Sequence, residues 1–221
     1  MQAGVQAESL RRTALKPEHL LVLRGRQEQA EAVLGLQLFL SSHDPGTRVH
    51  CENLSRYGVA IASSLKLPQA EIEALRIGGM VHDVGKIAIP TYILNKRSAL
   101  TLEERLIVEA HPVVGERMCA GIAGLRAALP IIRHHHERFD GSGYPDCLIG
   151  EGIPLAARIV HIVDVFDAMT SPRPYKPAWS AEHALGAMQQ ETERGWLDPR
   201  LFRQFARLVR RPEAAAFATL R

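Results

Sequence analysis

The sequence is poor in cysteine, in aromatic residues and in long apolar runs, and each shortage excludes a class of protein. The three cysteines, Cys51, Cys119 and Cys147, are scattered and form no CxxC pair. This argues against a disulfide framework and against a thiolate zinc site. Aromatic residues make up only 5% of the 221 residues. Aliphatic side chains and alanine must therefore fill the core, which suits packed helices.

Charge of one sign is also scarce. Lysine and arginine number 27 against 24 acidic residues, a net charge of +3, which is too small for bulk nucleic acid as a partner. A small anionic substrate held by a few placed cations remains compatible. No apolar run reaches about 18 residues, and the N-terminus lacks the pattern of a secretory signal. We therefore expect a cytoplasmic protein without a membrane span.

Helical periodicity dominates the chain and strand-like alternation is nearly absent, which predicts an all-α fold. Thr101 and Glu104 form a capping box, and Pro17 and Pro199 suit the first turns of two further helices. Residues 1–16 are expected to be loose. The predicted helices cover residues 17–40, 48–65, 68–82, 101–111, 112–125, 126–136, 154–169, 180–193 and 198–210.

The helix at 17–40 has two interpretations. Leu20, Leu23, Ala30 and Leu34 lie near one stripe and form a weak heptad. The helix could therefore pair with a partner, or it could lie on its own domain.

The most informative stretch is HHHERFDGSGYP, from His134 to Pro145. Imidazole nitrogens and carboxylate oxygens suit a divalent transition metal. The glycines allow a backbone to approach a ligand closely, and Tyr144 adds an aromatic face and a hydroxyl. The combination predicts a site.

Other polar residues fall on apolar helix faces or at helix ends. His50 shares a stripe with Leu54, Tyr57, Ile61 and Leu65, and His111 shares one with Val114, Met118 and Ile122. Asp164 lies in an apolar helix, while His82 and Asp83 precede Gly85, an expected helix terminator. Taken alone, each could be an ordinary hydrogen-bonded core residue, with Arg158 as a partner for Asp164.

Taken together, these residues predict one metal cluster, because separate buried polar groups would each need a partner. The candidate ligands are His50, His82, Asp83, His111, His135, His136 and Asp164. Seven nitrogen and oxygen ligands suit a six-coordinate, two-metal site of iron or manganese type. Two ions about 3.5–4 Å apart can activate water and clamp a phosphoryl group. Asp83 could bridge them, and Lys86 could neutralise phosphate charge.

Over roughly residues 41–210, the chain resembles the HD-GYP subgroup of HD-domain phosphohydrolases. The motifs are HDVGKIAIP (82–90), HPVVGE (111–116), HHERFDGSGYP (135–145), GEGIPLAARIVHIVDVFDAMTSPRPYKPA (150–178) and WLDP (196–199). The resemblance implies a helical bundle with a metal site in its core. It divides the chain into a tail and linker or partner helix (1–40), a catalytic domain (41–212) and a C-terminal tail (213–221).

The resemblance also implies an activity. Family members hydrolyse cyclic di-GMP to the linear dinucleotide pGpG, and often to GMP, by attack of a metal-bridging hydroxide on phosphorus. It assigns the same seven ligands, with Asp83 as the bridge and Lys86 near the scissile phosphate. It makes Tyr144, Arg173 and Lys176 expected substrate contacts, although the last two could form an ordinary basic turn and Tyr144 could simply pack on the fold.

Two positions depart from the family pattern. Some members carry a glutamate four residues before the first ligand and hold a third metal, but this chain has Gly46 there, so we predict two ions. Cys147 stands where glycine is commoner. Within the histidine run, His134 is the weakest ligand candidate, and Glu137 and Asp140 are expected to shape the loop.

Other functions remain open. The same metal site could act on another nucleotide or cyclic dinucleotide, or the domain could bind the messenger and signal through a partner. In this family the GYP loop is linked to diguanylate cyclase proteins, and the helix at 17–40 could form a homodimer.

Overall fold

The computed structural model describes residues 17–43, 47–172 and 177–211, with side chains from residue 25 onward except that of His43. Over these residues the secondary structure is helical and contains no strand, which confirms the predicted all-α class. The longer helices are α2 (Pro17–His43), α3 (Thr47–Ser64), α4 (Gln69–Val81), α6 (Leu102–Glu109), α7 (His111–Cys119), α9 (Leu155–Thr170), α10 (Ala181–Glu193) and α11 (Pro199–Val209). The short ones are η1 (Val84–Ala88), α5 (Thr91–Leu94), η2 (Ala123–Ala128), α8 (Leu129–His134) and η3 (Gly150–Gly152).

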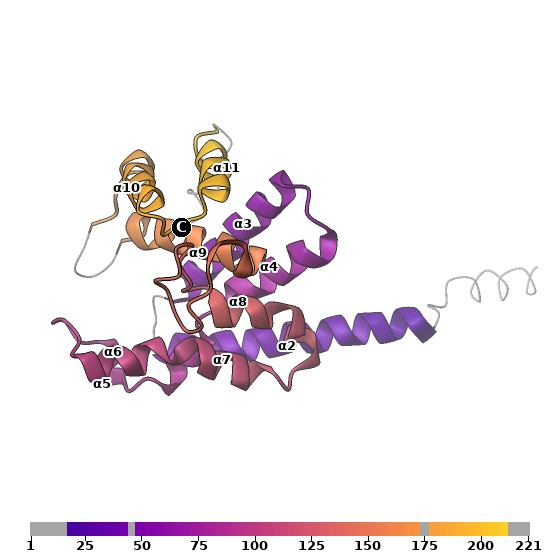
Figure 1. The fold of residues 1–221 in the computed structure, drawn as a ribbon. Helices are drawn as coiled ribbons and strands as arrows, with labels where there is room; N and C mark the ends of the chain where they lie inside the picture. Colours follow the sequence, from indigo (N-terminus) through magenta and orange to yellow (C-terminus); the bar gives the residue numbers. More distant parts are fainter. Residues whose placement is uncertain (1–16, 44–46, 173–176, 212–221) are drawn as a thin grey trace, which may run out of the picture.

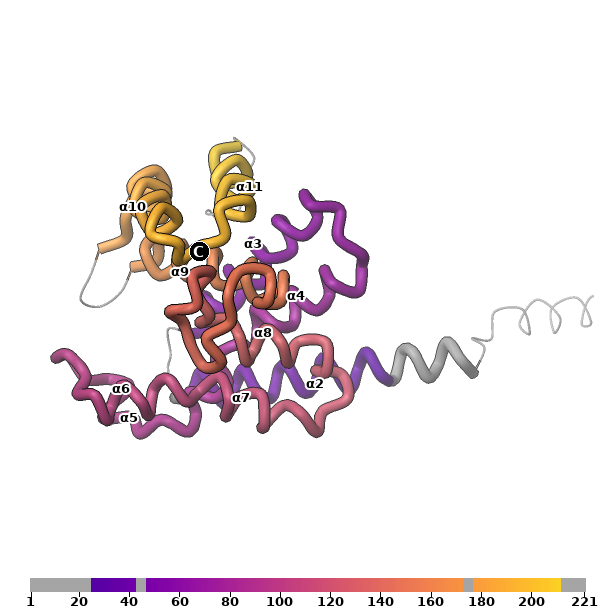
Figure 2. The backbone as a smooth tube through the Cα atoms, viewed as in Figure 1, coloured from indigo at the N-terminus to yellow at the C-terminus, as the bar shows by residue number. Residues whose placement is uncertain are grey.

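The helices pack around α9, which contacts α3, α4, α8, α10 and α11. Helices α3 and α4 pack closely together, and α2 runs along the side of the bundle beside α4, η1 and η2 (Figure 1). The long loop between α8 and α9 passes across the middle of the bundle (Figure 2). None of the described helices combines the length and apolarity needed to cross a bilayer.

Two apolar clusters form the core. One lies among α3, α4, α9, α10 and α11, where the rings of Tyr57, Phe166 and Phe205 meet edge to face with centroids 5.0–5.8 Å apart. The other joins α4, η1, α7, η2 and α8. Helix α8 belongs to both, because Ile131 packs in the first and Ile132 in the second. The ends of α4 and α8 are therefore fixed from two sides.

The predicted boundary between residues 101–111 and 112–125 is wrong in detail. His111 begins α7 instead of ending the preceding helix, and Pro112 occupies the first turn, where its missing N–H costs nothing. The helix ends at Cys119, and a 3-10 helix follows from Ala123. The predicted face is also displaced, since Gly115 and Cys119 are buried beside His111 while Met118 is 39% exposed.

The predicted helix at 17–40 is present as α2, and its C-terminal half packs on its own domain. Val33 and Leu36 join the second cluster, and Gln37 donates to the Met80 carbonyl at 2.9 Å. Leu34, from the predicted stripe, is instead 59% exposed, while the side chains of Leu20 and Leu23 lie outside the described part of the chain. The division at residue 40 stays a prediction.

Candidate metal centre

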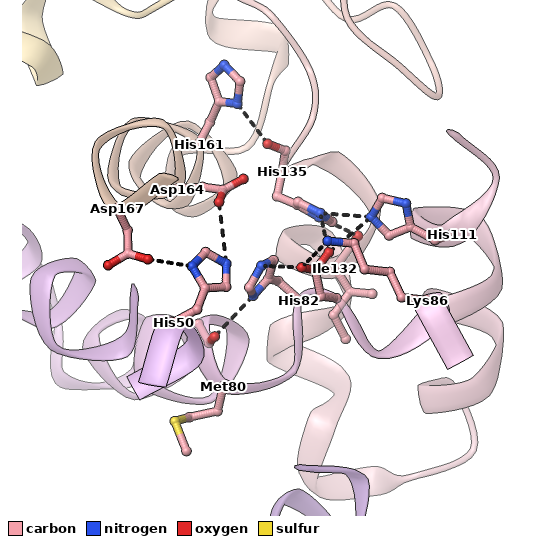
Figure 3. Close-up of polar contacts among 12 residues, drawn as sticks. His50, Met80, His82, Lys86, His111, Ile132, His135, His161, Asp164 and Asp167 are labelled. Atoms are coloured by element: carbon pink, nitrogen blue, oxygen red, sulfur yellow. Dashed lines mark hydrogen bonds and ion pairs between the residues drawn. The ribbon is translucent and has the colours of Figure 1, made fainter. Parts of the chain in front are cut away.

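The structure brings all seven predicted ligands together, most of them from the ends of helices and Asp164 from the middle of α9. Their ligand atoms form two groups, each within 4.8 Å. The Asp83 group consists of Asp83, His111, His135 and His136, and the His50 group consists of His50, His82 and Asp164. Figure 3 shows His50, His82 and Asp164 of the one group beside His111 and His135 of the other.

Asp83 lies between the groups and faces both. Its Oδ1 is 3.2 Å from His111 Nε2 and 3.6 Å from His135 Nε2, while its Oδ2 is 3.2 Å from His82 Nε2. In the second group, His50 Nε2 is 3.4 Å from Asp164 Oδ1. One carboxylate thus presents an oxygen to each group, which is the placement that a bridging ligand needs.

The backbone fixes the tautomers of three histidines. His82, His111 and His135 each direct Nδ1 at the carbonyl oxygen three residues earlier. These acceptors are Gly79, Val108 and Ile132, at 3.1, 2.7 and 2.9 Å. A neutral imidazole with its proton on Nδ1 has a lone pair on Nε2. All three Nε2 atoms therefore present lone pairs to the cluster.

These three imidazoles have no proton left to donate to one another or to Asp83. His111 Nε2 and His135 Nε2 lie 3.2 Å apart, and both face the carboxylate of Asp83. His82 Nε2 and Asp83 Oδ1 are buried without a hydrogen-bond partner. Buried acceptors that face one another repel, so the arrangement fits metal cations in addition to the ammonium of Lys86 at Asp83 Oδ2.

The charge states agree with this. Burial lowers the pKa of His135 to about 4 and holds the pKa of His136 well below its usual value, so both are neutral at pH 7. Burial alone would raise the pKa of Asp83, but its polar surroundings, with the charge of Lys86 foremost, outweigh burial and hold that pKa well below its usual range. The Asp83 group therefore combines the carboxylate of Asp83 with the neutral imidazoles of His135 and His136, as metal binding requires.

Lys86 supplies the cation nearest to the cluster. Its Nζ donates to Asp83 Oδ2 at 2.6 Å, and its side chain is 25% exposed against 4% for that of Asp83. The ammonium therefore lies where the buried cluster meets solvent. Its position suits contact with an anionic substrate.

Gly85 has a different role from the predicted one. It lies inside η1 and does not have the positive φ of a helix terminator. A Cβ there would lie 2.0 Å from the His111 carbonyl oxygen and 2.6 Å from Gly115 N. The absence of a side chain lets η1, which follows Asp83, pack directly against the start of α7.

The loop from Glu137 to Ile149, called here the GYP loop, closes over His136. Glu137 is 1% exposed, and its two oxygens accept from Asp146 N at 2.7 Å and Leu148 N at 3.1 Å. Tyr144 stacks on His136 with ring centroids 4.8 Å apart, and the Tyr144–Pro145 peptide bond is cis. One face of Tyr144 is therefore occupied by a candidate ligand, and Glu137 holds the shape of the loop.

The first residue of the histidine run belongs to a third group, with Glu137 and Asp146. His134 Nδ1 is 3.4 Å from Asp146 Oδ2, but Arg133 already binds both oxygens of Asp146, at 2.7 and 2.9 Å. Asp140 accepts from Ser142 N at 2.9 Å within the loop. Ionic and loop contacts therefore account for these carboxylates without a metal.

Sequence reasoning missed two residues of α9. His161 directs Nδ1 at the His135 carbonyl oxygen at 2.9 Å, and Asp167 Oδ2 lies 2.7 Å from His50 Nδ1. Both stand three residues from Asp164 in the same helix, and this spacing was the available signal. Arg158, considered as a partner for Asp164, instead pairs with Asp198 at 2.7 Å.

Three predicted positions lie outside the described residues. They are Gly46, on which the prediction of two rather than three ions depends, and the expected substrate contacts Arg173 and Lys176. Their roles stay predictions.

The chain matches the family model described as HD domain over residues 35–201. It is 38% identical over 206 residues to the cyclic di-GMP phosphodiesterase response regulator RpfG of Xanthomonas campestris pv. campestris, covering 90% of this chain and 54% of that protein. It is 34% identical over 159 residues to the 3'3'-cGAMP-specific phosphodiesterase 2 of Vibrio cholerae, covering 71% and 30%. The chain thus spans about half of the first relative and less of the second.

A solved structure shares the fold. The cyclic GMP-AMP specific phosphodiesterase of Vibrio cholerae superposes with a TM-score of 0.65 at 21% identity, covering 86% of this chain and 51% of that one. At this identity the likeness concerns the arrangement of helices alone.

Proposed function

Because this chain belongs to the HD-domain family and to its HD-GYP subgroup, we propose that it is a metal-dependent phosphodiesterase that hydrolyses cyclic di-GMP to pGpG. The observation that carries the proposal is the convergence of lone pairs on the two carboxylate oxygens of Asp83. Similarity to a cyclic di-GMP phosphodiesterase over most of this chain supports the choice of substrate.

The donor set fits two divalent ions. The Asp83 group would hold one and the His50 group the other, with Asp83 shared. Ions bound here would supply Lewis acidity, which activates water and neutralises charge on a phosphodiester. Mixed imidazole and carboxylate ligation favours iron or manganese, and we propose two ions of this kind.

The protein's own residues bind and orient the substrate. Lys86, beside Asp83 and partly exposed, places a positive charge where phosphate oxygens would approach. Tyr144 covers His136 and forms one wall of the site. Arg173 and Lys176 are proposed as further contacts to phosphate or base edges. Because cyclic di-GMP is an intracellular messenger, a cytoplasmic location follows from this substrate. Contact with diguanylate cyclase proteins and homodimer formation stay predictions.

The test is turnover of cyclic di-GMP by protein purified without oxygen and loaded with iron or manganese, with products separated by chromatography. We expect pGpG to accumulate, and Asp83→Ala to reduce its formation to background. Glu73→Gln, on an exposed part of α4, is the matched control and should keep wild-type turnover. Cleavage that survives Asp83→Ala would sink the proposal.

A second candidate is favoured by one observation. The chain is 34% identical over 159 residues to a 3'3'-cGAMP-specific phosphodiesterase, so a mixed cyclic dinucleotide is the alternative substrate. Equal concentrations of cyclic di-GMP, 3'3'-cGAMP and a mononucleotide should separate the candidates by their kcat/KM. Tight binding of cyclic di-GMP without turnover in fully loaded protein would instead favour a signalling module.

A further inference from the structure

Asp167 lies next to the metal centre but does not belong to either ligand group. It is 3% exposed and approaches His50 from the side opposite Asp164, with its Oδ2 at 2.7 Å from His50 Nδ1 (Figure 3). His50 is thus held between two carboxylates of α9. Of the two carboxylates, Asp164 is the one on the metal side of His50, because it lies next to Nε2, the ring atom that faces the cluster.

The other oxygen of Asp167 is fixed by two donors. Asn53 Nδ2 donates to Oδ1 at 2.7 Å, and Ser171 Oγ donates to the same atom at 3.0 Å. A carboxylate so bound can only accept hydrogen bonds. His50 Nδ1 must therefore carry a proton toward Asp167, and in the neutral ring that metal binding requires, the lone pair is on Nε2.

His50 is oriented differently from three other ligands. His82, His111 and His135 take their tautomer from backbone carbonyls, which no substitution removes. His50 takes its tautomer from a side chain. The His50 group therefore depends on Asp167, a residue that can be substituted without replacing any candidate ligand.

We propose that Asp167 is the positioning residue that keeps His50 competent to bind the second metal ion, so that it controls occupancy of the His50 group and leaves the Asp83 group unaffected. The inference rests on the proposed two-ion centre. It concerns the second ion alone and does not depend on which cyclic dinucleotide is cleaved.

Asp167→Asn tests this with almost no change of shape. The oxygen of the new amide keeps the position that accepts from Asn53 Nδ2 and Ser171 Oγ, so its NH2 group would turn toward His50. His50 Nδ1 would then accept, and the ring proton would move to Nε2 and block the metal. Adding Asn53→Asp reverses this, because the new carboxylate accepts from Asn at position 167, whose oxygen again faces His50.

The experiment measures equivalents of Mn²⁺ bound per chain by equilibrium dialysis and elemental analysis. We expect two equivalents for the wild type. In Asp167→Asn the second ion should bind about 10- to 100-fold more weakly, while the first keeps its affinity. The Asn53→Asp, Asp167→Asn double variant should recover most of the loss, and Glu73→Gln should match the wild type.

Wild-type affinity for both ions in Asp167→Asn would overturn the inference, as would a folded double variant that recovers nothing. Should Asp167→Asn fail to fold, ¹⁵N spectra of histidine side chains in zinc-loaded wild type decide. A proton on His50 Nδ1 supports the inference, and a proton on Nε2 overturns it. A wild type that binds two ions without cleaving any cyclic dinucleotide would refute the proposed function and leave the Asp167 test intact.

Discussion

Replacing Gly85 by alanine should move Asp83 away from His111 within the metal centre. The new Cβ would lie 2.0 Å from the His111 carbonyl oxygen and 2.6 Å from Gly115 N, whereas ordinary contacts are 3.4–4 Å. Both obstacles are backbone atoms of α7 and cannot rotate away. The start of η1 would therefore have to move from α7 by a distance on the order of 1 Å, and Asp83 would move away from His111.

Overpacking of this kind costs about 1–3 kcal/mol, and the fixed backbone places Gly85→Ala at the upper end. For a domain of this size, each kcal/mol lowers Tm by roughly 2–4 °C, so we expect a fall of about 6–12 °C in thermal unfolding. Affinity for Mn²⁺ should fall as well, because Asp83 Oδ1 and His111 Nε2 would no longer lie close enough to share one ion.

Gly186→Ala is the matched control. Gly186 lies within α10, and a Cβ there meets nothing within 4 Å. Alanine should stabilise this helix by about 0.5–1 kcal/mol. If Gly85→Ala unfolds at the wild-type temperature and binds metal normally, the close approach of η1 and α7 is not what positions Asp83.

Three further substitutions test the GYP loop. The buried carboxylate of Glu137 accepts hydrogen bonds from two loop amides, and Glu137→Gln turns an NH2 group toward one of them. The substitution should lower the free energy of unfolding in denaturant by about 1–3 kcal/mol. An unchanged midpoint would refute the role of Glu137. Cys147 has a φ of 53°, so Cys147→Gly should raise stability by up to about 1 kcal/mol, and a lower Tm would contradict this. Hydrogen bonds from Arg133 lower the pKa of Asp146, so this pair stabilises the fold above the ordinary carboxyl pKa of about 4 and loses its effect as pH falls through the lower folded-state pKa. The stability difference between wild type and Asp146→Asn should therefore shrink on acidification, and a difference that grows would contradict the pairing.

The clustering of the seven candidate ligands could be predicted from the sequence, because most of them occupy places where a polar residue conflicts with its surroundings. His50 precedes Leu54 and Ile61 on a stripe that is buried in the structure, and Asp164 interrupts an apolar helix. The positions of these residues in separate helices made a shared cluster the economical explanation. The structure brings these side chains together as expected. The packing of the helices determines which of their atoms meet.

The remaining features depend on contacts that periodicity does not encode. Gly85 is needed because the backbone of α7 lies against η1, which no local pattern indicates. Asp167 could have been suspected from its spacing to Asp164, but its role depends on the Nδ1 atom of His50, 117 residues away. The face of α7 was misassigned because its burial is set by packing against η1 and α8, which covers Gly115 and leaves Met118 exposed.

The most direct test of the metal centre is anomalous X-ray scattering from crystals of the manganese-loaded protein. We expect two peaks, one within bonding distance of the Asp83 group and one within bonding distance of the His50 group, with Asp83 contacting both. Asp83→Ala should remove the shared contact and at least one peak. Peaks confined to the neighbourhood of His134, Glu137 and Asp146, or an absence of peaks at Asp83 in fully loaded protein, would contradict the assignment.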